Sequence, residues 1–352
     1  MLRSYGRKLL LCLLAFSALA AKPKGSAKAP TCSAPEACRA SCARADARAC
    51  FQEGFFLRNG KAEAKNVVLA LKLYLRACSA GFGQACTNLG QLYDEGGEVG
   101  QNKTRAFVLF TKGCGLGDMS GCQNLAMLFE GERSIHDDVQ AVKLYSRACE
   151  GGLPDACTNL GFKYAAGSGV KADARKAVAL YQKACQAGSS LGCGNLGVMF
   201  STGQGGLKAD PAKAAGLYLR ACDAGEGSAC RNLGILWRKG RGVAKEDDCK
   251  AMDLYQKACD AGDAGGCNNL GTMYSDDGSC ADKPRDKKRA ADLYKAACDQ
   301  SEATGCSNLA DLYSQGDGVR QDADKASSLY QKACDLGSDS ACSQVPKKAS
   351  AD

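Results

Sequence analysis

The sequence predicts an all-α protein, an α/α superhelix (solenoid) of about nine disulfide-stapled helix-turn-helix repeats. Two observations predict this fold class: a two-helix pattern recurs along nearly the whole chain, and every copy carries two cysteines eight positions apart. Repeats of about 20–50 residues are typical of solenoids, in which each unit packs only against its neighbours. The 352 residues are therefore expected to form one elongated array.

The segment from Ala141 to Tyr164 shows the pattern of one unit. Apolar residues spaced by three and four positions predict a helix up to Cys149 and a second helix from Cys157, with a Gly- and Pro-containing turn between them. A Gly-x-Gly run follows the second helix, as at 167–169, and suits the left-handed position after a helix end. Because these glycines close a helix and follow no strand, we interpret them as caps and not as phosphate-binding loops.

The units also share residues around their cysteines. Leu-Tyr precedes the first cysteine, as at Leu144-Tyr145, and Asn-Leu-Gly or Asn-Leu-Ala follows the second. This combination resembles the Sel1-like repeat, a relative of the tetratricopeptide repeat. The cysteine pair in every unit resembles the secreted Helicobacter cysteine-rich proteins. The resemblance covers about residues 39–345 and implies an α/α superhelix with one disulfide per repeat.

The disulfides that the resemblance implies also suit the spacing, because a cysteine ending one helix can reach a cysteine opening its antiparallel partner. Zinc is the competing interpretation, but zinc sites usually place cysteines two to four apart, often with histidine, and this chain has one histidine. The expected pairs are Cys42–Cys50, Cys78–Cys86, Cys114–Cys122, Cys149–Cys157, Cys185–Cys193, Cys222–Cys230, Cys259–Cys267, Cys298–Cys306 and Cys334–Cys342.

Four further cysteines lie outside these pairs. Cys32 and Cys38 flank a turn at Pro35 and are predicted to pair. Cys249 and Cys280 lie in connections one repeat apart, and because adjacent connections stack in a solenoid, a Cys249–Cys280 bridge is predicted. Pairing between chains and free thiols remain the alternatives.

The ends of the chain differ from the repeats. Residues 1–20 are predicted to be a cleaved signal peptide, with a basic start, a short apolar stretch and an Ala18-Leu19-Ala20 cleavage site. An uncleaved anchor is the alternative. Residues 21–38 are predicted to be a flexible basic linker and N-terminal turn, 39–345 the repeat solenoid and 346–352 a disordered tail. We expect a secreted or periplasmic, monomeric protein with no membrane span after cleavage.

The formal charge of +8 does not indicate a nucleic-acid partner. Most of the excess lies in the signal peptide and the two tails, so the repeat body is nearly neutral. A nucleic-acid-binding protein would carry a basic stripe on its folded part. We therefore expect no nucleic-acid partner.

No catalytic, cofactor-binding or metal-binding set is predicted. His136 is the only histidine and is interpreted as a surface residue. The resemblance implies weak β-lactam binding or β-lactamase activity. Serine β-lactamases, however, carry Ser-x-x-Lys with Ser-Asp-Asn and Lys-Thr-Gly. We expect this set to be missing, and we favour a protein that is not an enzyme.

The asparagine after each second cysteine is the best candidate for binding. A row of amides can hydrogen-bond the backbone of an extended peptide. The alternative, favoured by their regular occurrence, is that they satisfy hydrogen bonds within the repeat. The repeated tyrosines and Trp237 are predicted to lie mostly in the core. The candidate asparagines are Asn88, Asn124, Asn159, Asn195, Asn232, Asn269 and Asn308.

The function predicted from these observations is an exported scaffold that binds a peptide, protein or cell-envelope partner on its concave face. Weak β-lactam hydrolysis and a purely structural spacer are the alternatives. The concave face of a solenoid is its usual binding surface.

Overall fold

The structure is a computed structural model that describes residues 32, 34–60, 64–276, 280 and 282–345. Within these residues the secondary structure is helical and contains no strand, which confirms the predicted all-α solenoid. The predicted signal peptide, residues 21–31 of the predicted linker and the predicted tail lie outside the described residues. None of the described helices is both long enough and apolar enough to cross a membrane.

Two kinds of helix alternate along the chain. The A helices end near the first cysteine of each unit: α2 (Pro35–Ala43), α4 (Val67–Ser79), α6 (Lys103–Gly115), α8 (Asp138–Glu150), α10 (Ala174–Gln186), α12 (Pro211–Asp223), α14 (Asp248–Asp260), α16 (Lys287–Asp299) and α18 (Ala323–Asp335). The B helices begin near the second cysteine: α3 (Ala47–Asn59), α5 (Gly83–Glu95), α7 (Met119–Gly131), α9 (Pro154–Ala166), α11 (Ser190–Thr202), α13 (Gly227–Arg238), α15 (Ala264–Ser275), α17 (Ala303–Gln315) and α19 (Asp339–Cys342). One 3-10 turn, η1 (Gly97–Val99), lies between α5 and α6.

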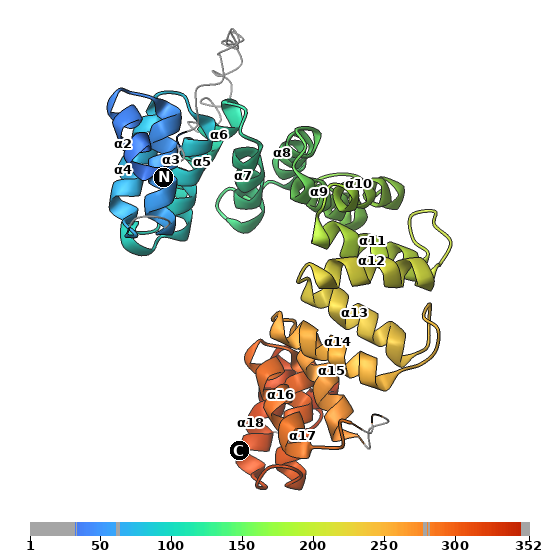
Figure 1. Cartoon of the computed structure of the whole chain (residues 1–352). Coiled ribbons are helices and arrows are strands. Elements are labelled where there is room, and N and C mark those ends of the chain that lie inside the picture. Colours follow the sequence, from blue (N-terminus) through green and yellow to red (C-terminus); the bar gives the residue numbers. More distant parts are fainter. Residues whose placement is uncertain (1–31, 33, 61–63, 277–279, 281, 346–352) are drawn as a thin grey trace, which may run out of the picture.

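The helices stack one after another along an arc from α2 to α18 (Figure 1). B helices of neighbouring units contact each other directly at α5–α7, α9–α11, α13–α15 and α15–α17. No two A helices of neighbouring units make comparable contact within the described residues. The array therefore consists of a closely spaced B layer and a more widely spaced A layer.

The loops between a B helix and the next A helix are fixed by capping. Asp173 accepts a hydrogen bond from the backbone N–H of Lys176 at 3.0 Å and so caps the start of α10. The N–H of Asp173 donates in turn to the carbonyl of Tyr164 at the end of α9, at 2.8 Å. Gly167 adopts the left-handed conformation (φ 73°) at the end of α9, as the Gly-x-Gly pattern predicted.

Basic side chains join neighbouring A helices at the disulfide end of the array. Arg147 of α8 donates to the carbonyl of Cys114 in α6 at 2.9 Å, and Arg220 of α12 donates to the carbonyl of Cys185 in α10 at 2.7 Å. The last carbonyls of a helix have no partner within the helix, and a cation there also compensates the negative end of the helix dipole. These bonds therefore hold the A layer together where its helices do not pack closely.

The prediction that the repeated aromatic residues lie mostly in the core is confirmed, because most are buried and the others pack against the core clusters while remaining half-buried. Tyr74, Tyr145, Tyr181, Tyr218, Tyr255 and Tyr294 of the A helices are buried. In the B layer Tyr274 is buried, but Tyr93, Tyr164, Tyr313 and Trp237 are only half-buried. A Lys or Arg in the first turn of the next A helix lies over each of these B-layer rings; the Lys250 ammonium, for example, lies 4.2 Å from the Trp237 ring centroid.

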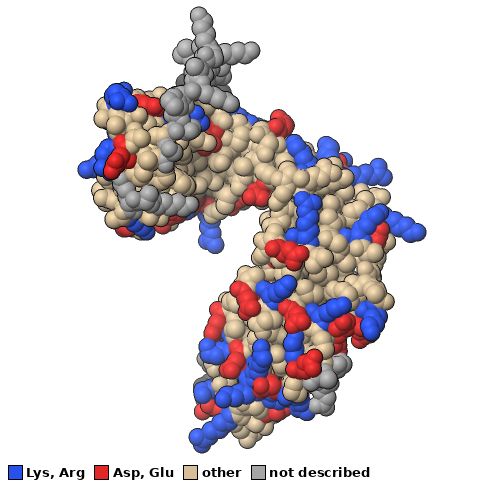
Figure 2. All heavy atoms as spheres, in the orientation of Figure 1, with Lys and Arg blue, Asp and Glu red and all other residues tan. Residues whose placement is uncertain are grey.

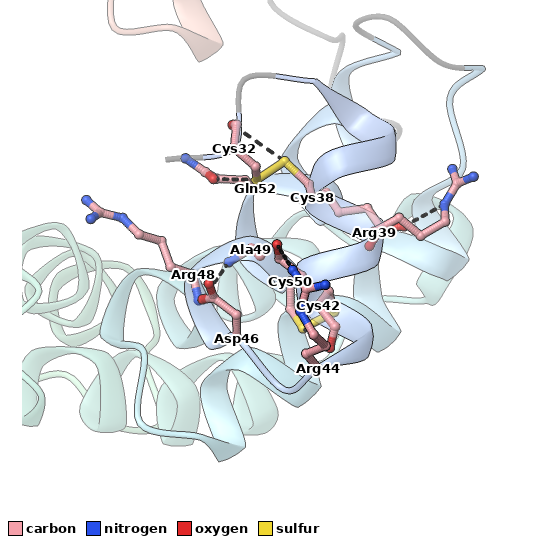
Figure 3. The surroundings of a disulfide bond; sticks show 12 residues. Cys32, Cys38, Arg39, Cys42, Arg44, Asp46, Arg48, Ala49, Cys50 and Gln52 are labelled. Atoms are coloured by element: carbon pink, nitrogen blue, oxygen red, sulfur yellow. Dashed lines mark hydrogen bonds and ion pairs between the residues drawn. A yellow bond between two sulfur atoms is a disulfide. The ribbon is translucent and has the colours of Figure 1, made fainter. Parts of the chain in front are cut away.

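Both ends of the array depart from the repeat. At the N-terminal end, α2 carries the Cys38 and Cys42 sulfurs of two neighbouring disulfides (Figure 3). Glu53 of α3 occupies the position of the usual buried leucine and pairs with Arg39 of α2 at 3.2 Å. At the C-terminal end α19 has only four residues, so the final B helix is short.

Candidate functional site

Each described cysteine is disulfide-bonded, in the eleven pairs given above. The nine repeat disulfides join the last turn of an A helix to the first turn of the next B helix, with Cα atoms 4.5–4.7 Å apart. Cys249 at the start of α14 is bonded to the buried Cys280 of the long connection before α16. No described thiol is therefore free to act as a nucleophile or metal ligand.

A buried polar cluster lies between α7, α8 and α9. Lys163 of α9 is 5% exposed, at a position where the neighbouring B helices place Leu128 or Met199. Its Nζ lies 2.5 Å from Glu130 Oε1 and 2.6 Å from Asp138 Oδ1, and Tyr145 donates a hydrogen bond to the other Glu130 oxygen. No sequence pattern predicted this cluster, although a lysine at a repeat position that is otherwise aliphatic is a visible signal.

The expectation that Ser-x-x-Lys is missing is wrong, because residues 168–171 read Ser-Gly-Val-Lys. These residues lie in the loop after α9 and not on a helix, so one helical turn does not bring Ser168 and Lys171 together. The Ser168 hydroxyl instead donates to Asp138 at 2.6 Å and lies 3.3 Å from the Nζ of Lys163. Ser-Asp-Asn and Lys-Thr-Gly do not occur in the sequence.

The electrostatics of the cluster oppose general-base catalysis at Ser168. Burial alone would lower the pKa of Lys163, but its hydrogen bonds to Asp138 and Glu130 outweigh burial and raise that pKa above its ordinary value. The hydrogen bond from Lys163 and, second in size of effect, the hydrogen bond from Ser168 lower the pKa of the Asp138 carboxyl to about 2. A lysine whose pKa is raised is protonated at neutral pH and cannot accept the serine proton there, so the cluster is interpreted as a structural ion-pair network.

His136 lies at the edge of this cluster, in the irregular connection between α7 and α8. Its side chain is half-exposed, its Nδ1 lies 3.0 Å from the carbonyl of Glu130, and its Nε2 lies 3.5 Å from Asp138. In the described part of the chain, no three histidine, cysteine or acidic side chains are grouped as metal ligands.

The candidate asparagines form a row along the B layer, one in each helix from α5 to α17, and all are half-buried. One has a hydrogen-bond partner, because Asn308 donates to Asn268 at 2.9 Å, whereas Asn88 and Asn159 only lie near the hydroxyls of Tyr74 and Tyr145. The other four make no side-chain hydrogen bond with a described residue: Asn124, Asn195, Asn232 and Asn269.

An apolar strip runs beside the amides, which the sequence analysis did not identify. Each member lies three positions after an asparagine, and residues at i and i+3 are neighbours on a helix surface. Met127, Phe162 and Val198 are 51%, 59% and 37% exposed, and Ile235 is half-buried. The same position holds Gln91 in α5 and Thr272 in α15, so the strip spans α7, α9, α11 and α13.

Charges on the molecule do not form one large field. On the face seen in Figure 2, basic and acidic side chains are interspersed over the C-terminal units and sparse over the middle of the array. Many of them form ion pairs, such as Arg231–Asp263 at 2.8 Å and Lys287–Asp317 at 3.0 Å. An unbroken basic track of the kind that binds a nucleic-acid backbone is absent from this view.

Comparison with protein families gives one match. The family described as Sel1 repeat matches residues 47–82, 83–118, 120–153, 154–189, 190–226, 227–263, 264–302 and 303–338. These eight repeats begin at B helices, half a unit out of phase with the nine cysteine pairs. Each disulfide between them therefore joins the last helix of one matched repeat to the first helix of the next, as Cys78–Cys86 does.

Three bacterial proteins are among the solved structures that are similar to this chain. The protective antigen c5321 of uropathogenic Escherichia coli is 25% identical (TM-score 0.65; 88% of this chain, 66% of that chain), so the match spans just under two thirds of its length. A Sel1 repeat protein from Oxalobacter formigenes is 23% identical (TM-score 0.60; 95% and 98%). Helicobacter pylori cysteine rich protein B is 32% identical over 38% of this chain and 96% of that chain (TM-score 0.32). No curated protein sequence matches this chain significantly.

Proposed function

This chain belongs to the Sel1-repeat family, and from that premise we propose that it is an exported scaffold whose B layer binds a polypeptide partner. Sel1-repeat proteins typically mediate interactions between proteins. A binding function without catalysis also agrees with the ion-pair cluster around Lys163, because this lysine is held protonated and is not available as a base.

The observation that carries the proposal is the pairing of unsatisfied amides with exposed apolar side chains. Asn195 and Val198 of α11 illustrate it, because the amide has no partner within the described residues and the valine is 37% exposed. A half-buried amide with no partner in the repeat can bond water, so it is available to hydrogen-bond a polypeptide instead. A contiguous apolar surface with polar groups at its border is typical of protein-binding sites.

The packing of the layers supports placing this surface on the concave side. Four pairs of neighbouring B helices contact each other (α5–α7, α9–α11, α13–α15 and α15–α17), whereas neighbouring A helices do not make comparable contact within the described residues. A stack whose two layers differ in spacing curves toward the closer layer. The amides and the apolar strip then face the inside of the arc seen in Figure 1.

The disulfide framework fits an extracellular or periplasmic protein, because such bonds persist in oxidising compartments. Export through the predicted signal peptide 1–20 is part of the proposal. The partner is then a polypeptide of the same compartment or of the cell envelope.

The test is capture of partners from the native compartment by the oxidised, immobilised protein, followed by mass spectrometry. A variant with Asn124, Asn195 and Asn232 changed to Ala is expected to lose the captured protein. A matched variant with exposed glutamines of the A layer changed, such as Gln182→Ala, is expected to keep it. Equal capture by all three proteins, or no capture by any, would favour the structural spacer.

A further inference from the structure

We propose that the A layer binds the surface of an anionic phospholipid bilayer through α4, α6, α8, α10 and α12. This inference goes beyond the proposed function, because it concerns the other layer of the array and leaves the B layer free for a polypeptide. It follows from three properties of these five helices: a surplus of basic residues, exposed aliphatic side chains among the basic ones, and the wide spacing of the A layer.

Basic residues outnumber acidic ones by twelve to three in these five helices. In α14, α16 and α18 the numbers are eight and seven, so the surplus is confined to one part of the A layer. Acidic residues of the B helices and connections, such as Asp94, Glu95 and Glu98, balance it, which keeps the repeat body nearly neutral. The twelve basic residues are Lys72, Arg76, Lys103, Arg105, Lys112, Lys143, Arg147, Arg175, Lys176, Lys183, Lys213 and Arg220.

Most of these basic side chains have no carboxylate partner among the described residues. Ion pairs are formed by Lys103, Lys176 and Lys213 and by none of the other nine. Arg147 and Arg220 donate to backbone carbonyls, which fix the position of the guanidinium groups without neutralising their charge. The A layer therefore attracts an anionic partner, and each Lys or Arg close to an anionic lipid surface adds to the attraction.

Exposed aliphatic side chains lie among these basic residues. In α4, Val68, Lys72 and Leu75 are spaced by four and three positions, on the side of the helix opposite the buried Ala70 and Tyr74. Val68 and Leu75 are 51% and 52% exposed. All the large aliphatic side chains that are exposed on the described A helices belong to this same part of the layer: Val68, Leu69, Leu75, Val108, Val139 and Leu219.

The next two A helices repeat the arrangement. Arg105, Val108 and Lys112 of α6 are spaced by three and four positions, and Val108 is 59% exposed. Val139 of α8 is 50% exposed, and Lys143 follows it four positions later. Each helix thus presents an outward stripe in which aliphatic and basic side chains alternate. Basic side chains beside aliphatic ones are typical of helix surfaces that lie against the headgroups of an anionic membrane.

This combination selects a bilayer over other anionic partners. A nucleic acid offers phosphates to the basic residues but no apolar phase to Leu75 or Val108. A protein interface concentrates its apolar contacts in a packed centre, whereas neighbouring A helices make no close contact and keep their aliphatic side chains apart. A fluid bilayer accepts dispersed groups and offers both phosphates and an acyl boundary. Phospholipid fits better than lipopolysaccharide, whose sugar layer separates the acyl chains from the protein.

The test is co-sedimentation of the oxidised, full-length mature protein with lipid vesicles. One set of vesicles contains phosphatidylcholine alone, a second contains phosphatidylcholine with phosphatidylglycerol, and a third contains lipopolysaccharide in place of phosphatidylglycerol. Binding is expected to be at least tenfold tighter to the phosphatidylglycerol vesicles than to the other two, and to weaken as salt is added.

Lys72→Glu combined with Lys143→Glu is expected to weaken binding to the phosphatidylglycerol vesicles at least tenfold. The matched control is Lys257→Glu combined with Lys288→Glu on α14 and α16, which changes the net charge equally. All four lysines are exposed and form no ion pair with a described residue. The control is expected to change the affinity less than threefold. The lysines of the two chain ends remain in both variants, so they do not cause a difference between them.

Leu75→Ser combined with Val108→Ser is expected to weaken vesicle binding at least fivefold, because the aliphatic groups no longer reach the acyl boundary. Met127→Ser combined with Phe162→Ser is the matched control, since these side chains are equally exposed but lie on the B layer, and it is expected to leave vesicle binding unchanged. Circular dichroism checks that each variant is folded.

Equal binding to vesicles with and without phosphatidylglycerol would overturn the inference, as would an equal loss in the two charge-reversal variants. Binding that requires lipopolysaccharide would also contradict it. If the Lys72 and Lys143 variant keeps vesicle binding but loses a protein captured from the native compartment, the surface binds an acidic protein and the inference is wrong. Partner capture by the asparagine variant is measured separately, so failure of this inference leaves the proposed function of the B layer intact.

Discussion

The ring of Tyr181 lies directly against Gly161, so closely that a Cβ placed on Gly161 would stand 2.7 Å from Cε1 of the tyrosine. Gly161 belongs to α9 and Tyr181 to α10, the next helix along the chain. The same approach recurs in other units, for example between Gly197 and Tyr218. The repeated Leu-Gly and Leu-Tyr motifs are therefore two halves of one helix contact.

Gly161→Ala is expected to destabilise the protein by about 1–3 kcal/mol, because the added methyl group forces the buried Tyr181 ring to move. Thermal unfolding followed by circular dichroism would measure the loss. Gly194→Ala is the matched control, since its nearest neighbouring atom would be 3.8 Å from the new Cβ. That control should be neutral or slightly stabilising, because alanine favours a helix. An equal effect of both changes would contradict the contact.

Lys163→Met is expected to cost about 2 kcal/mol, although methionine occupies the corresponding buried position in α11. The loss arises because Glu130 and Asp138 are left without their shared cation. Changing these two residues as well, to Gln and Asn, should recover most of the stability. Urea unfolding of the single and triple variants checks this prediction, and a triple variant no better than the single one would refute it.

The stability contributed by Asp138 is expected to disappear in acid. Its pKa falls from 3.8 to about 2 in the folded protein, chiefly through the hydrogen bond from Lys163. A group with a lowered folded pKa stabilises the protein above the unfolded pKa, and this contribution is lost as pH falls from about 4 to about 2. The difference in unfolding free energy between the protein and Asp138→Asn, about 1–2 kcal/mol at pH 5, should therefore close by pH 2. Asp223→Asn, an exposed change in α12, serves as the control.

The Cys249–Cys280 disulfide is expected to stabilise the array more than a repeat disulfide does. Its cysteines are 31 positions apart, against 8 in the repeat pairs. Chain entropy then predicts about 3.7 kcal/mol for the long loop and about 2.6 kcal/mol for a short one. The double change to Ser at 249 and 280 should lower the melting temperature more than the same change at Cys259 and Cys267. A non-reduced peptide map should link the two segments, and a free thiol at either position would contradict the pairing.

Lys250→Met is expected to change the fluorescence of Trp237, the only tryptophan of the chain, because the ammonium group lies over its ring. The methionine keeps most of the aliphatic stem, so the loss of stability should be about 0.5–1 kcal/mol. Emission spectra of the folded protein provide the measurement. Lys257→Met, an exposed change on the same helix, should leave the emission unchanged.

The sequence by itself determined the repeat, the all-α class and the cysteine pattern, because each of these follows from residues at a fixed spacing. A helical face needs apolar residues three and four positions apart, and this is visible in one unit such as 141–164. The motifs that contain Gly161 and Tyr181 were also visible in the sequence. The contact between these two residues was not, because sequence spacing alone does not show which helix faces pack against each other.

Only the tertiary structure decided the role of residues that break the repeat or face solvent. Lys163 appears in the sequence as one more lysine, and its burial among Glu130, Asp138 and Ser168 depends on three segments meeting across two loops. The asparagines were predicted as a row, yet only stacking showed that Asn195 and Asn232 lack internal partners. The apolar strip depends on the same stacking, because only the stacked B helices, among which α9 and α11 contact each other directly, place one exposed apolar side chain per helix along the same layer.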